Sequence, residues 1–297
     1  MAPRFAIIGF GEAGSNIAKT LREVGVGDIA TYDILLDDPG ARAAMLEKAE
    51  ALGAAPRDTL RDAIADADIV FSTVVCKASL PVAQEAAKHL RPEQFYVDFN
   101  SISPGLKRQV AGAVTVSGAR FVEASVMGGF PGTGHRAPTL LGGAGARDYM
   151  ALVAPLDFKV DFVQDEVGLA SAIKMVRSIM MKGMESLYLE CMRAANHFGI
   201  EQRVLDTIDK STAGRTWTDG ANLIMPRTAV HAGRRADEMA QVALTLQEIG
   251  IDPTMAQATE KNLRWCASLG LKEIYKDRQA EGYADVLEKI QAASGKS

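Results

Sequence analysis

Short apolar runs alternate with helical patterns over the first 165 residues of the chain. The runs predict strands at 4–9, 28–33, 68–75, 94–99 and 120–125. A helix is expected directly after the first strand, over 13–24, because its apolar residues recur at helical spacing. Strands that alternate with helices are typical of a parallel sheet, and 139–162 should add one or two further strands.

The pattern changes after residue 165. No proline occurs from Val167 to His197, and apolar residues recur at helical spacing through this stretch. Asp165 and Glu166 precede it where a helix dipole favours acidic residues, and Gly199 follows it as a C-terminal cap. Such a helix would be about 45 Å long, enough to connect two domains. Further helices are expected over 202–211, 234–249, 254–269 and 283–293.

The motif Gly9-Phe10-Gly11-Glu12-Ala13-Gly14 follows the first strand immediately and opens the first helix. Its G-x-G-x-x-G spacing is typical of dinucleotide binding, because Gly9 permits the tight turn, Gly11 lets the backbone approach a pyrophosphate, and Gly14 lets helix and strand pack closely. The N–H groups at the helix start then face the phosphates. A glycine turn without a ligand is the alternative, but both flanks of the motif favour the dinucleotide site.

Asp33 ends the second expected strand, 19 residues after Gly14. A carboxylate at this position can accept both hydroxyls of the adenosine ribose and repels a 2′-phosphate. Three apolar residues follow, and no basic residue occurs before Arg42, so NAD is favoured over NADP. The alternative is that Asp33 only caps a loop.

Two loops after later strands are expected to edge the cofactor. The first contains Val74, Val75 and Cys76, and the second contains Asn100 and Ser101. Ligands of a doubly wound sheet lie at the carboxyl ends of its strands, which both loops follow. A turn-forming role for Asn100 and Ser101 is the alternative.

These patterns predict an α/β Rossmann domain with a doubly wound, mostly parallel sheet over 1–165. An all-α domain over 166–297 should follow, beginning with the long interdomain helix and serving substrate binding and dimerisation. Within it, Trp217 and His231 fall in a segment interpreted as a loop, and core packing is expected for Trp217.

Composition narrows the class of protein. The 297 residues are 47% hydrophobic and 24% charged, which is typical of a water-soluble globular enzyme, and a net charge of −4 argues against a nucleic-acid partner. Without a signal peptide or a membrane-spanning stretch, a cytoplasmic protein is expected. Cys76, Cys191 and Cys266 have no metal or disulfide spacing, so no metal site is expected and each cysteine should be buried.

Several segments carry a resemblance to a known family. They are IIGFGEAGSNIA at the start, VDFNSISP (Val97–Pro104), EASVMGGFPGTGHRAPTLLGG and VGLASAIKMV (Val167–Val176). The last three are similar to the patterns D-x-S-T-x-x-P, D-A-P-V-S-G-G and G-x-G-x-x-x-K. On these motifs the chain resembles the β-hydroxyacid dehydrogenase superfamily, which includes 3-hydroxyisobutyrate, tartronate-semialdehyde and 6-phosphogluconate dehydrogenases. Its C-terminal run, HAGRRADEMAQVALTLQEIGIDPTM, resembles a 6-phosphogluconate-dehydrogenase-like branch with a domain of unknown function.

The resemblance implies that Lys174 is the catalytic lysine. In the family, this lysine gives a proton to the substrate carbonyl during reduction and removes one from the hydroxyl during oxidation. Its flanks at positions 172, 173, 175 and 176 are apolar, and an apolar helix favours the neutral amine that a base requires. From the residues alone, a surface lysine with its stem along the helix is the alternative.

The chain departs from the family pattern around the substrate. Met127 replaces the serine that contacts the substrate carboxylate, although Gly128 and Gly129 remain, and Arg177 with Ser178 replaces an asparagine after the lysine. The resemblance implies that these residues, together with Ser101, line the substrate site. Methionine makes the pocket larger and more apolar, so a substrate bulkier than hydroxyisobutyrate is expected.

The sequence leaves two alternative roles open for Arg177. Its guanidinium can hold a substrate carboxylate with two parallel hydrogen bonds. It can instead pair with Asp161, Asp165 or Glu166 on the surface. The same two alternatives, ligand contact or solvated surface group, stay open for four further residues: His135, Arg136, Arg234 and Arg235.

The resemblance implies an NAD(P)-dependent oxidoreductase that acts on a β-hydroxy acid or its semialdehyde. Imine or ketone reduction is an alternative, which the retention of Lys174 disfavours because imine reductases usually replace this residue. A dinucleotide-binding protein without turnover is another. As partners we expect a small carboxylate substrate and a second copy of the chain in a homodimer, with no nucleic acid and no membrane.

Overall fold

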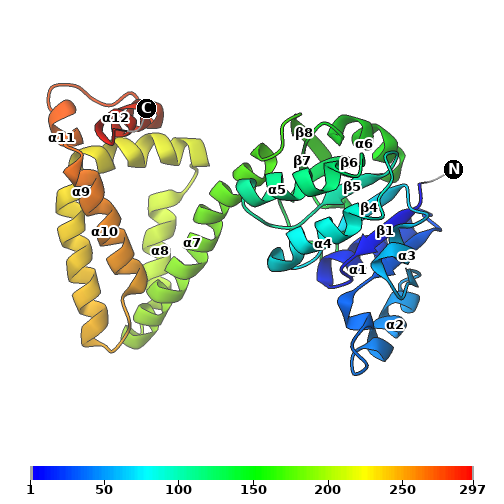
Figure 1. Ribbon diagram of the computed structural model, residues 1–297. Helices are drawn as coiled ribbons and strands as arrows, with labels where there is room; N and C mark the ends of the chain where they lie inside the picture. Colours follow the sequence, from blue (N-terminus) through cyan, green and yellow to red (C-terminus); the bar gives the residue numbers. More distant parts are fainter. Residues whose placement is uncertain (1–2, 296–297) are drawn as a thin grey trace. The chain divides into compact units, whose positions relative to one another are not determined.

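The computed structural model describes residues 3–295, and these form a single eight-stranded sheet followed by helices (Figure 1). The strand order is β3-β2-β1-β4-β5-β6-β7-β8, and every neighbouring pair is parallel except β6 and β7. The strands are β1 (Phe5–Ile8), β2 (Ile29–Tyr32), β3 (Ala55–Pro56), β4 (Ile69–Ser72), β5 (Phe95–Asp98), β6 (Arg120–Val126), β7 (Thr139–Gly142) and β8 (Val160–Gln164). The predicted mostly parallel sheet is confirmed, with two strands in 139–164.

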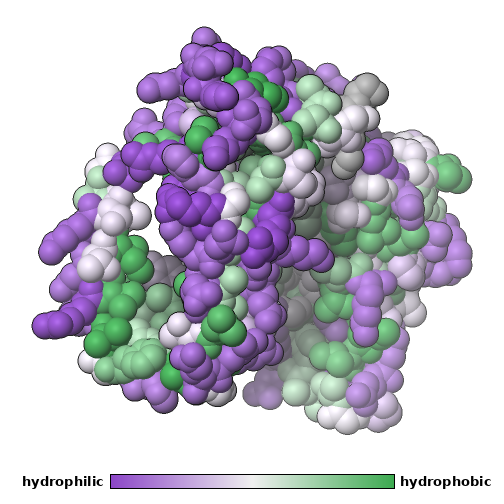
Figure 2. Space-filling view, turned by 90° about the vertical axis from the view of Figure 1, so that its left-hand side faces the viewer, coloured by the Kyte–Doolittle hydropathy of each residue, from purple (hydrophilic) through white to green (hydrophobic). Residues whose placement is uncertain are grey.

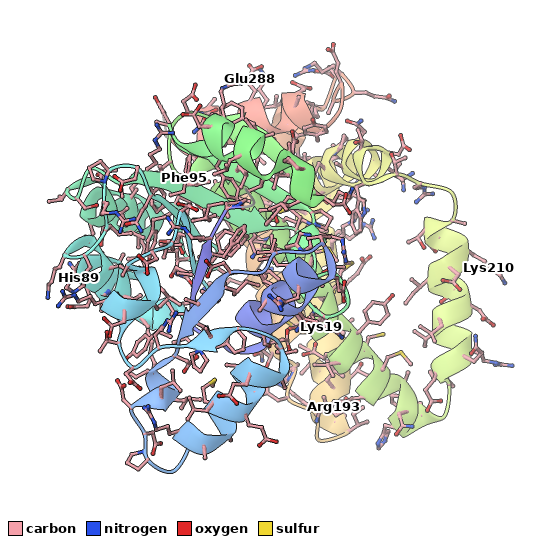
Figure 3. The ribbon with its side chains drawn as sticks, turned by 90° about the vertical axis from the view of Figure 1, so that its right-hand side faces the viewer. Lys19, His89, Phe95, Arg193, Lys210 and Glu288 are labelled. Atoms are coloured by element: carbon pink, nitrogen blue, oxygen red, sulfur yellow. The ribbon has the colours of Figure 1, made fainter. Side chains whose placement is uncertain are left out.

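Helices cover both faces of the sheet. One apolar core joins alternate strand residues such as Ile7 to α1, α2 and α6, and a second joins residues such as Ile8 to α3, α4 and α5. Figure 3 shows Lys19 of α1 and His89, just beyond α4, on opposite sides of the sheet. These helices are α1 (Glu12–Glu23), α2 (Arg42–Ala51), α3 (Leu60–Ile64), α4 (Ser79–Ala87), α5 (Pro104–Thr115) and α6 (Ala146–Val153).

The strand order reverses at β1, which pairs with β2 on one side and β4 on the other. The chain crosses from β1 to β2 through α1 on one face, whereas α3, which leads into β4, packs on the other face. The loops that leave β1 and β4 therefore separate at their carboxyl ends, and a doubly wound sheet opens its ligand crevice at such a point.

All described elements after β8 are helical, which confirms the predicted all-α C-terminal part. The helices are α7 (Leu169–Phe198), α8 (Glu201–Thr212), α9 (Trp217–Glu248), α10 (Thr254–Ser268), α11 (Leu271–Ile274) and α12 (Tyr283–Ala293). The chain divides into two compact units between Ile179 and Met180, inside α7. We call the parts before and after this point the sheet unit and the helical unit.

Helix α9 corrects the prediction of a loop around Trp217 and His231. It begins at Trp217 because Thr216 and Asp219 form a reciprocal capping box, in which each side chain accepts the other residue's backbone N–H. The helix then continues through Pro226 to Glu248. Trp217 is 67% exposed, so the predicted core packing of this side chain is wrong.

The start of α7 also differs from the prediction. The helix begins at Leu169, so Asp165 and Glu166 lie before its first turn, which holds no acidic residue. The predicted glycine cap at the other end is confirmed, because Gly199 follows the helix with φ of 67°.

Two of the three cysteines contradict the expectation of burial, since Cys76 and Cys191 are exposed and only Cys266 is buried. Within residues 3–295, no helix is long and apolar enough to cross a membrane. The same part of the chain has no cluster of three or more His, Cys, Asp or Glu side chains placed to hold a metal ion.

Candidate functional site

The glycine-rich turn between β1 and α1 has the geometry that the motif predicts. Gly9 has φ of 86°, a left-handed conformation that favours glycine. A Cβ on Gly14 would lie 2.2 Å from the Gly9 carbonyl oxygen, so α1 could not pack this closely on the strand with any other residue there. A Cβ on Gly11 would meet no atom within 4 Å. The turn is therefore closed on its protein side and open at Gly11, where a pyrophosphate needs room.

The N-terminus of α1 completes this cradle. No side chain among the described residues caps the helix at Gly11, which leaves the first N–H groups of α1 for a ligand. Lys48 of α2 donates hydrogen bonds to the carbonyl oxygens of Phe10 (2.7 Å) and Gly11 (3.2 Å) and so connects the turn to α2. Nothing in the sequence pattern distinguishes Lys48 from a surface lysine, and the sequence analysis missed it.

Asp33 lies beside the same turn. Its carboxylate accepts the N–H of Phe10 at 2.6 Å and the N–H of Leu35 at 3.0 Å. The loop-capping alternative is therefore part of its role, but a carboxylate has about four lone-pair sites, and the remaining ones can accept ribose hydroxyls. The nearest arginine along the chain, Arg42, is bound to the Leu36 carbonyl and the Asp58 carboxylate.

The loops after β4 and β5 meet at the carboxyl edge of the sheet. The thiol of Cys76 donates to the Ser101 carbonyl oxygen at 3.1 Å, and the Asn100 amide donates to the Ser72 hydroxyl at 2.9 Å. Val75, Cys76 and Ser101 are exposed, whereas Asn100 is buried and its side-chain oxygen has no partner among the described residues. The two predicted cofactor loops are thus in direct contact.

A buried ion pair between Lys107 and Asp98 holds the loop after β5 in place. The Lys107 ammonium lies 3.0 Å from the Asp98 carboxylate and also donates to the carbonyl oxygens of Asp98 and Asn100, and neither charged side chain is exposed to solvent. Burial raises the pKa of Asp98, while Lys107 opposes this shift. The sequence analysis missed this pair, because a lysine in an amphipathic helix gives no sign of complete burial.

The predicted substrate loop follows β6. Met127 is half-buried and donates its N–H to the Pro138 carbonyl oxygen at 2.7 Å, while Gly128 and Gly129 are exposed. His135 ties this loop to α1 and to the segment before β8, through Thr20 (2.8 Å) and the Leu156 carbonyl (2.8 Å). Burial lowers the pKa of His135, which keeps the imidazole neutral in this role.

Two of the residues whose roles were left open are therefore structural. His135 is 4% exposed and packs between elements. Arg136 forms ion pairs with Glu23 at 3.1 Å and with Asp157 at 3.4 Å. Arg234 pairs with Glu238, and Arg235 donates to Thr228, within the helical unit.

Lys174, Arg177 and Ser178 lie on the part of α7 that belongs to the sheet unit. Lys174 is half-buried, Arg177 is exposed, and the Ser178 hydroxyl donates to the Lys174 carbonyl oxygen at 2.8 Å. Of the acids suggested as partners of Arg177, Asp165 pairs instead with Arg147. Among the described residues no ion pair holds Arg177.

The start of α7 is joined to the sheet by a residue that the sequence analysis did not single out. Glu123 of β6 is buried, and its two carboxylate oxygens accept the N–H groups of Gly168 and Ser171, each at 2.7 Å. The only signal was its place as the first residue of the segment EASVMGG. The candidate lysine, one turn beyond Ser171, is thus connected to the strand that leads to Met127.

The fold and this edge of the sheet define a dinucleotide-binding α/β protein with a helical C-terminal part. Residues 4–157 match the model for the NAD binding domain of 6-phosphogluconate dehydrogenase. Because this match covers more than half of the chain, the protein belongs to that family. Residues 195–266 match a domain of unknown function, DUF1932.

Individual proteins are similar to this chain over most of its length. A mitochondrial 3-hydroxyisobutyrate dehydrogenase of Drosophila melanogaster is 23% identical over 87% of this chain and 79% of its own length. The crystal structure of a conserved hypothetical protein from Sinorhizobium meliloti 1021 is 33% identical, covers 99% of this chain and 97% of that one, and has a TM-score of 0.61. An imine reductase from Myxococcus stipitatus, solved with NADP⁺, covers 97% and 100% with a TM-score of 0.73, and its 20% identity shows the fold alone.

Proposed function

We propose that the protein is an NAD-dependent oxidoreductase that interconverts a β-hydroxy acid and its semialdehyde or keto form. The observation that carries this proposal is the joint presence of the open glycine cradle at Gly11 and of Lys174 on a helix hydrogen-bonded to the same sheet through Glu123. The cradle supports dinucleotide binding, and the lysine supports proton transfer at the reacting oxygen.

The chemistry divides between cofactor and protein. When bound, the nicotinamide ring accepts or supplies the hydride. During oxidation, the neutral amine of Lys174 takes the hydroxyl proton while the C–H electron pair leaves as hydride, and a C=O bond remains. During reduction, the Lys174 ammonium returns the proton to the carbonyl oxygen.

The choice of NAD rests on Asp33 and its surroundings. Its carboxylate is oriented by Phe10 and Leu35 and would repel a 2′-phosphate. Arg42, the nearest arginine along the chain, is bound to the Leu36 carbonyl and the Asp58 carboxylate. We expect Asp33→Ser combined with Ile34→Arg to shift the preference toward NADP. A wild-type protein that used NADP as efficiently as NAD would contradict this part of the proposal.

We assign the substrate side to Ser101, Met127–Gly129 and Arg177 with Ser178. The half-buried Met127 supports an apolar wall, and the exposed guanidinium of Arg177 is available for a carboxylate. This combination favours an acid with an apolar or branched body.

We also propose that the protein is a homodimer. Large apolar side chains on α7 are exposed, including Val176 (64%), Ile179 (71%) and Leu189 (68%), and such surfaces are usually covered by a partner. Figure 2 shows hydrophobic side chains at the surface on the side of the helical unit. A monomer by light scattering that keeps full activity on dilution would refute the dimer.

A substrate panel tests the function. Hydroxy acids, semialdehydes, ketones and imines are each supplied with NAD(H) and NADP(H), and the absorbance of the reduced nicotinamide is followed. Turnover of a β-hydroxy acid or its carbonyl form with NAD(H) is expected. Turnover of imines alone would replace this proposal by imine reduction, and cofactor binding without any turnover would indicate a dinucleotide-binding protein.

A further inference from the structure

Glu123 caps a helix from a distant part of the chain. Gly168 and Ser171 occupy the N-cap and third positions of α7, two of the places where a helix has N–H groups without intrahelical partners. Oε2 of Glu123 accepts the Gly168 N–H and Oε1 accepts the Ser171 N–H, each at 2.7 Å. The two residues lie 45 and 48 positions after Glu123 in the sequence. The side chain is 0% exposed, and its negative charge lies at the positive end of the α7 dipole.

The sheet makes room for this carboxylate. Gly142 of β7 is paired directly with Glu123 in the antiparallel register of β6 and β7. A Cβ at position 142 would lie 2.7 Å from Oε2 of Glu123, the oxygen that accepts the Gly168 N–H. Any residue other than glycine would therefore displace this oxygen from Gly168. The absence of a side chain at Gly142 therefore allows the Glu123 carboxylate to reach the start of α7.

The two hydrogen bonds of Glu123 fix the position of α7 on the sheet more fully than a single hydrogen bond would. A side chain within the helix can cap an N–H group, but it cannot relate the helix to the sheet. Glu123 holds two points of the first turn of α7 against β6, which restrains both the rotation of the helix and its height above the strand. Three residues after Ser171 comes Lys174, and four residues after Glu123 comes Met127.

We propose that Glu123 is the positioning residue that sets where Lys174 stands relative to the substrate loop 127–129. The inference rests on the proposed function, because it assumes proton transfer by Lys174. Displacement of a catalytic group by about 1 Å can reduce turnover roughly 100-fold. A positioning role therefore predicts a loss in kcat, with little change in cofactor affinity.

Glu123→Gln is the principal variant. Its amide keeps the shape of the side chain, but only one oxygen can accept, and the NH₂ group opposes the other N–H. We expect kcat to fall about 10- to 100-fold, with the Kd for NADH, from nicotinamide fluorescence, within about threefold of wild type. Gly142→Ala, which keeps the carboxylate and pushes on it, should lower kcat in the same direction and serves if Glu123→Gln does not fold.

Glu190 provides a matched control. Its carboxylate, within the helical unit, accepts the N–H groups of Met255 (2.7 Å) and Ala256 (2.8 Å) at the start of α10. Glu190→Gln loses the same kind of cap and should lower the Tm while leaving kcat within about twofold. Equal kcat values for wild type, Glu123→Gln and Gly142→Ala, all folded, would overturn the proposal.

A second readout separates this proposal from the proposed function. The lysines are reductively ¹³C-methylated, and the NMR signal of Lys174 is assigned with Lys174→Met. Its titration midpoint should change in Glu123→Gln and Gly142→Ala but not in Glu190→Gln. If the wild type turns over no substrate, the proposed function fails, and an unchanged Lys174 midpoint in both sheet variants overturns the positioning role.

Discussion

The sheet unit and the helical unit differ in the charged side chains that they bury, although each leaves some large apolar side chains exposed. The sheet unit buries even charged groups completely, and Asp98, Lys107 and Glu123 all have partners there. Among the described residues, the helical unit buries no charged side chain, its helix α8 buries none of its residues, and large apolar groups such as Trp217 are exposed. Buried, fully paired polar groups specify one arrangement of the backbone, whereas exposed apolar faces require another surface to cover them.

The comparison suggests where function is determined. In the sheet unit, the cofactor turn, the loop at Asn100 and the start of α7 are each held by hydrogen bonds from within the same unit. We therefore expect substitutions there to change chemistry or folding, and substitutions on the helical unit to have smaller effects. The following predictions test this contrast.

The largest effect is expected for Lys174→Met. Losing a general acid–base should lower kcat by roughly 10²- to 10⁴-fold. NADH binding, followed by fluorescence, should remain, because the role that we propose for the lysine is at the substrate and not at the glycine turn. Lys182→Met, on an exposed part of α7 in the helical unit, is the control. Near-normal turnover by Lys174→Met would contradict the assigned role.

Lys107→Met should produce the largest loss of stability. It leaves the Asp98 carboxylate buried without its cation, which costs about 3 to 5 kcal/mol. Because burial then raises the folded pKa of Asp98 further above its unfolded value of about 4, the folded variant binds the extra proton. Its deficit in unfolding free energy should accordingly be full at neutral pH and shrink as the pH falls.

Urea unfolding of wild type and variant at several pH values measures this deficit. Arg120→Met is the control, because its pair with Asp148 is half-exposed and should contribute at most about 1 kcal/mol. A deficit in Lys107→Met no larger than that of Arg120→Met would show that burial of the pair matters little.

Arg177→Ala tests the substrate side of the sheet unit. If the guanidinium holds a carboxylate, kcat/KM for an acidic substrate should fall about 10- to 150-fold, corresponding to about 1.5–3 kcal/mol. A neutral analogue should be affected less. The Tm should not change, because no ion pair holds Arg177 among the described residues. Arg193→Ala, also exposed on α7, is the control, and a lower Tm with unchanged kinetics would indicate a surface role.

The smallest effect concerns the helical unit alone. The paired hydrogen bonds from the Arg278 guanidinium hold the pKa of Asp285, on α12, at about 2. A depressed folded pKa contributes stability above the unfolded value of about 4, and this contribution is lost as the pH falls toward 2. Asp285→Asn should remove this step.

Tryptophan fluorescence can follow this step, because both tryptophans of the chain, Trp217 and Trp265, lie in the helical unit. An acid transition that is the same in wild type and Asp285→Asn would show that the pair contributes nothing measurable.

Local pattern was sufficient for much of the fold. The strands and helices that the sequence predicts overlap those observed. The strands appeared as short apolar runs because β1, β4 and β5 are buried on both faces of the sheet. The helices appeared as apolar residues at helical spacing because one face of such a helix is buried. The glycine motif was sufficient for the turn between β1 and α1, since Gly9 and Gly14 allow a backbone path that other residues exclude. The pattern failed at α9, where Pro226 and exposed apolar residues obscured a helix capped by Thr216 and Asp219.

By itself, the sequence determined the alternation of strands and helices before residue 165, the glycine turn after the first strand and the place of Lys174 on a long helix. The tertiary structure alone decided which charged residues are buried and paired. Lys48 supports the glycine turn, Lys107 supports the loop at Asn100, and Glu123 holds the start of α7. The spacing of these residues along the chain does not reveal the contacts. A hydrogen bond depends on the distance between two atoms in space, whereas a sequence pattern shows only which residues are neighbours along the backbone.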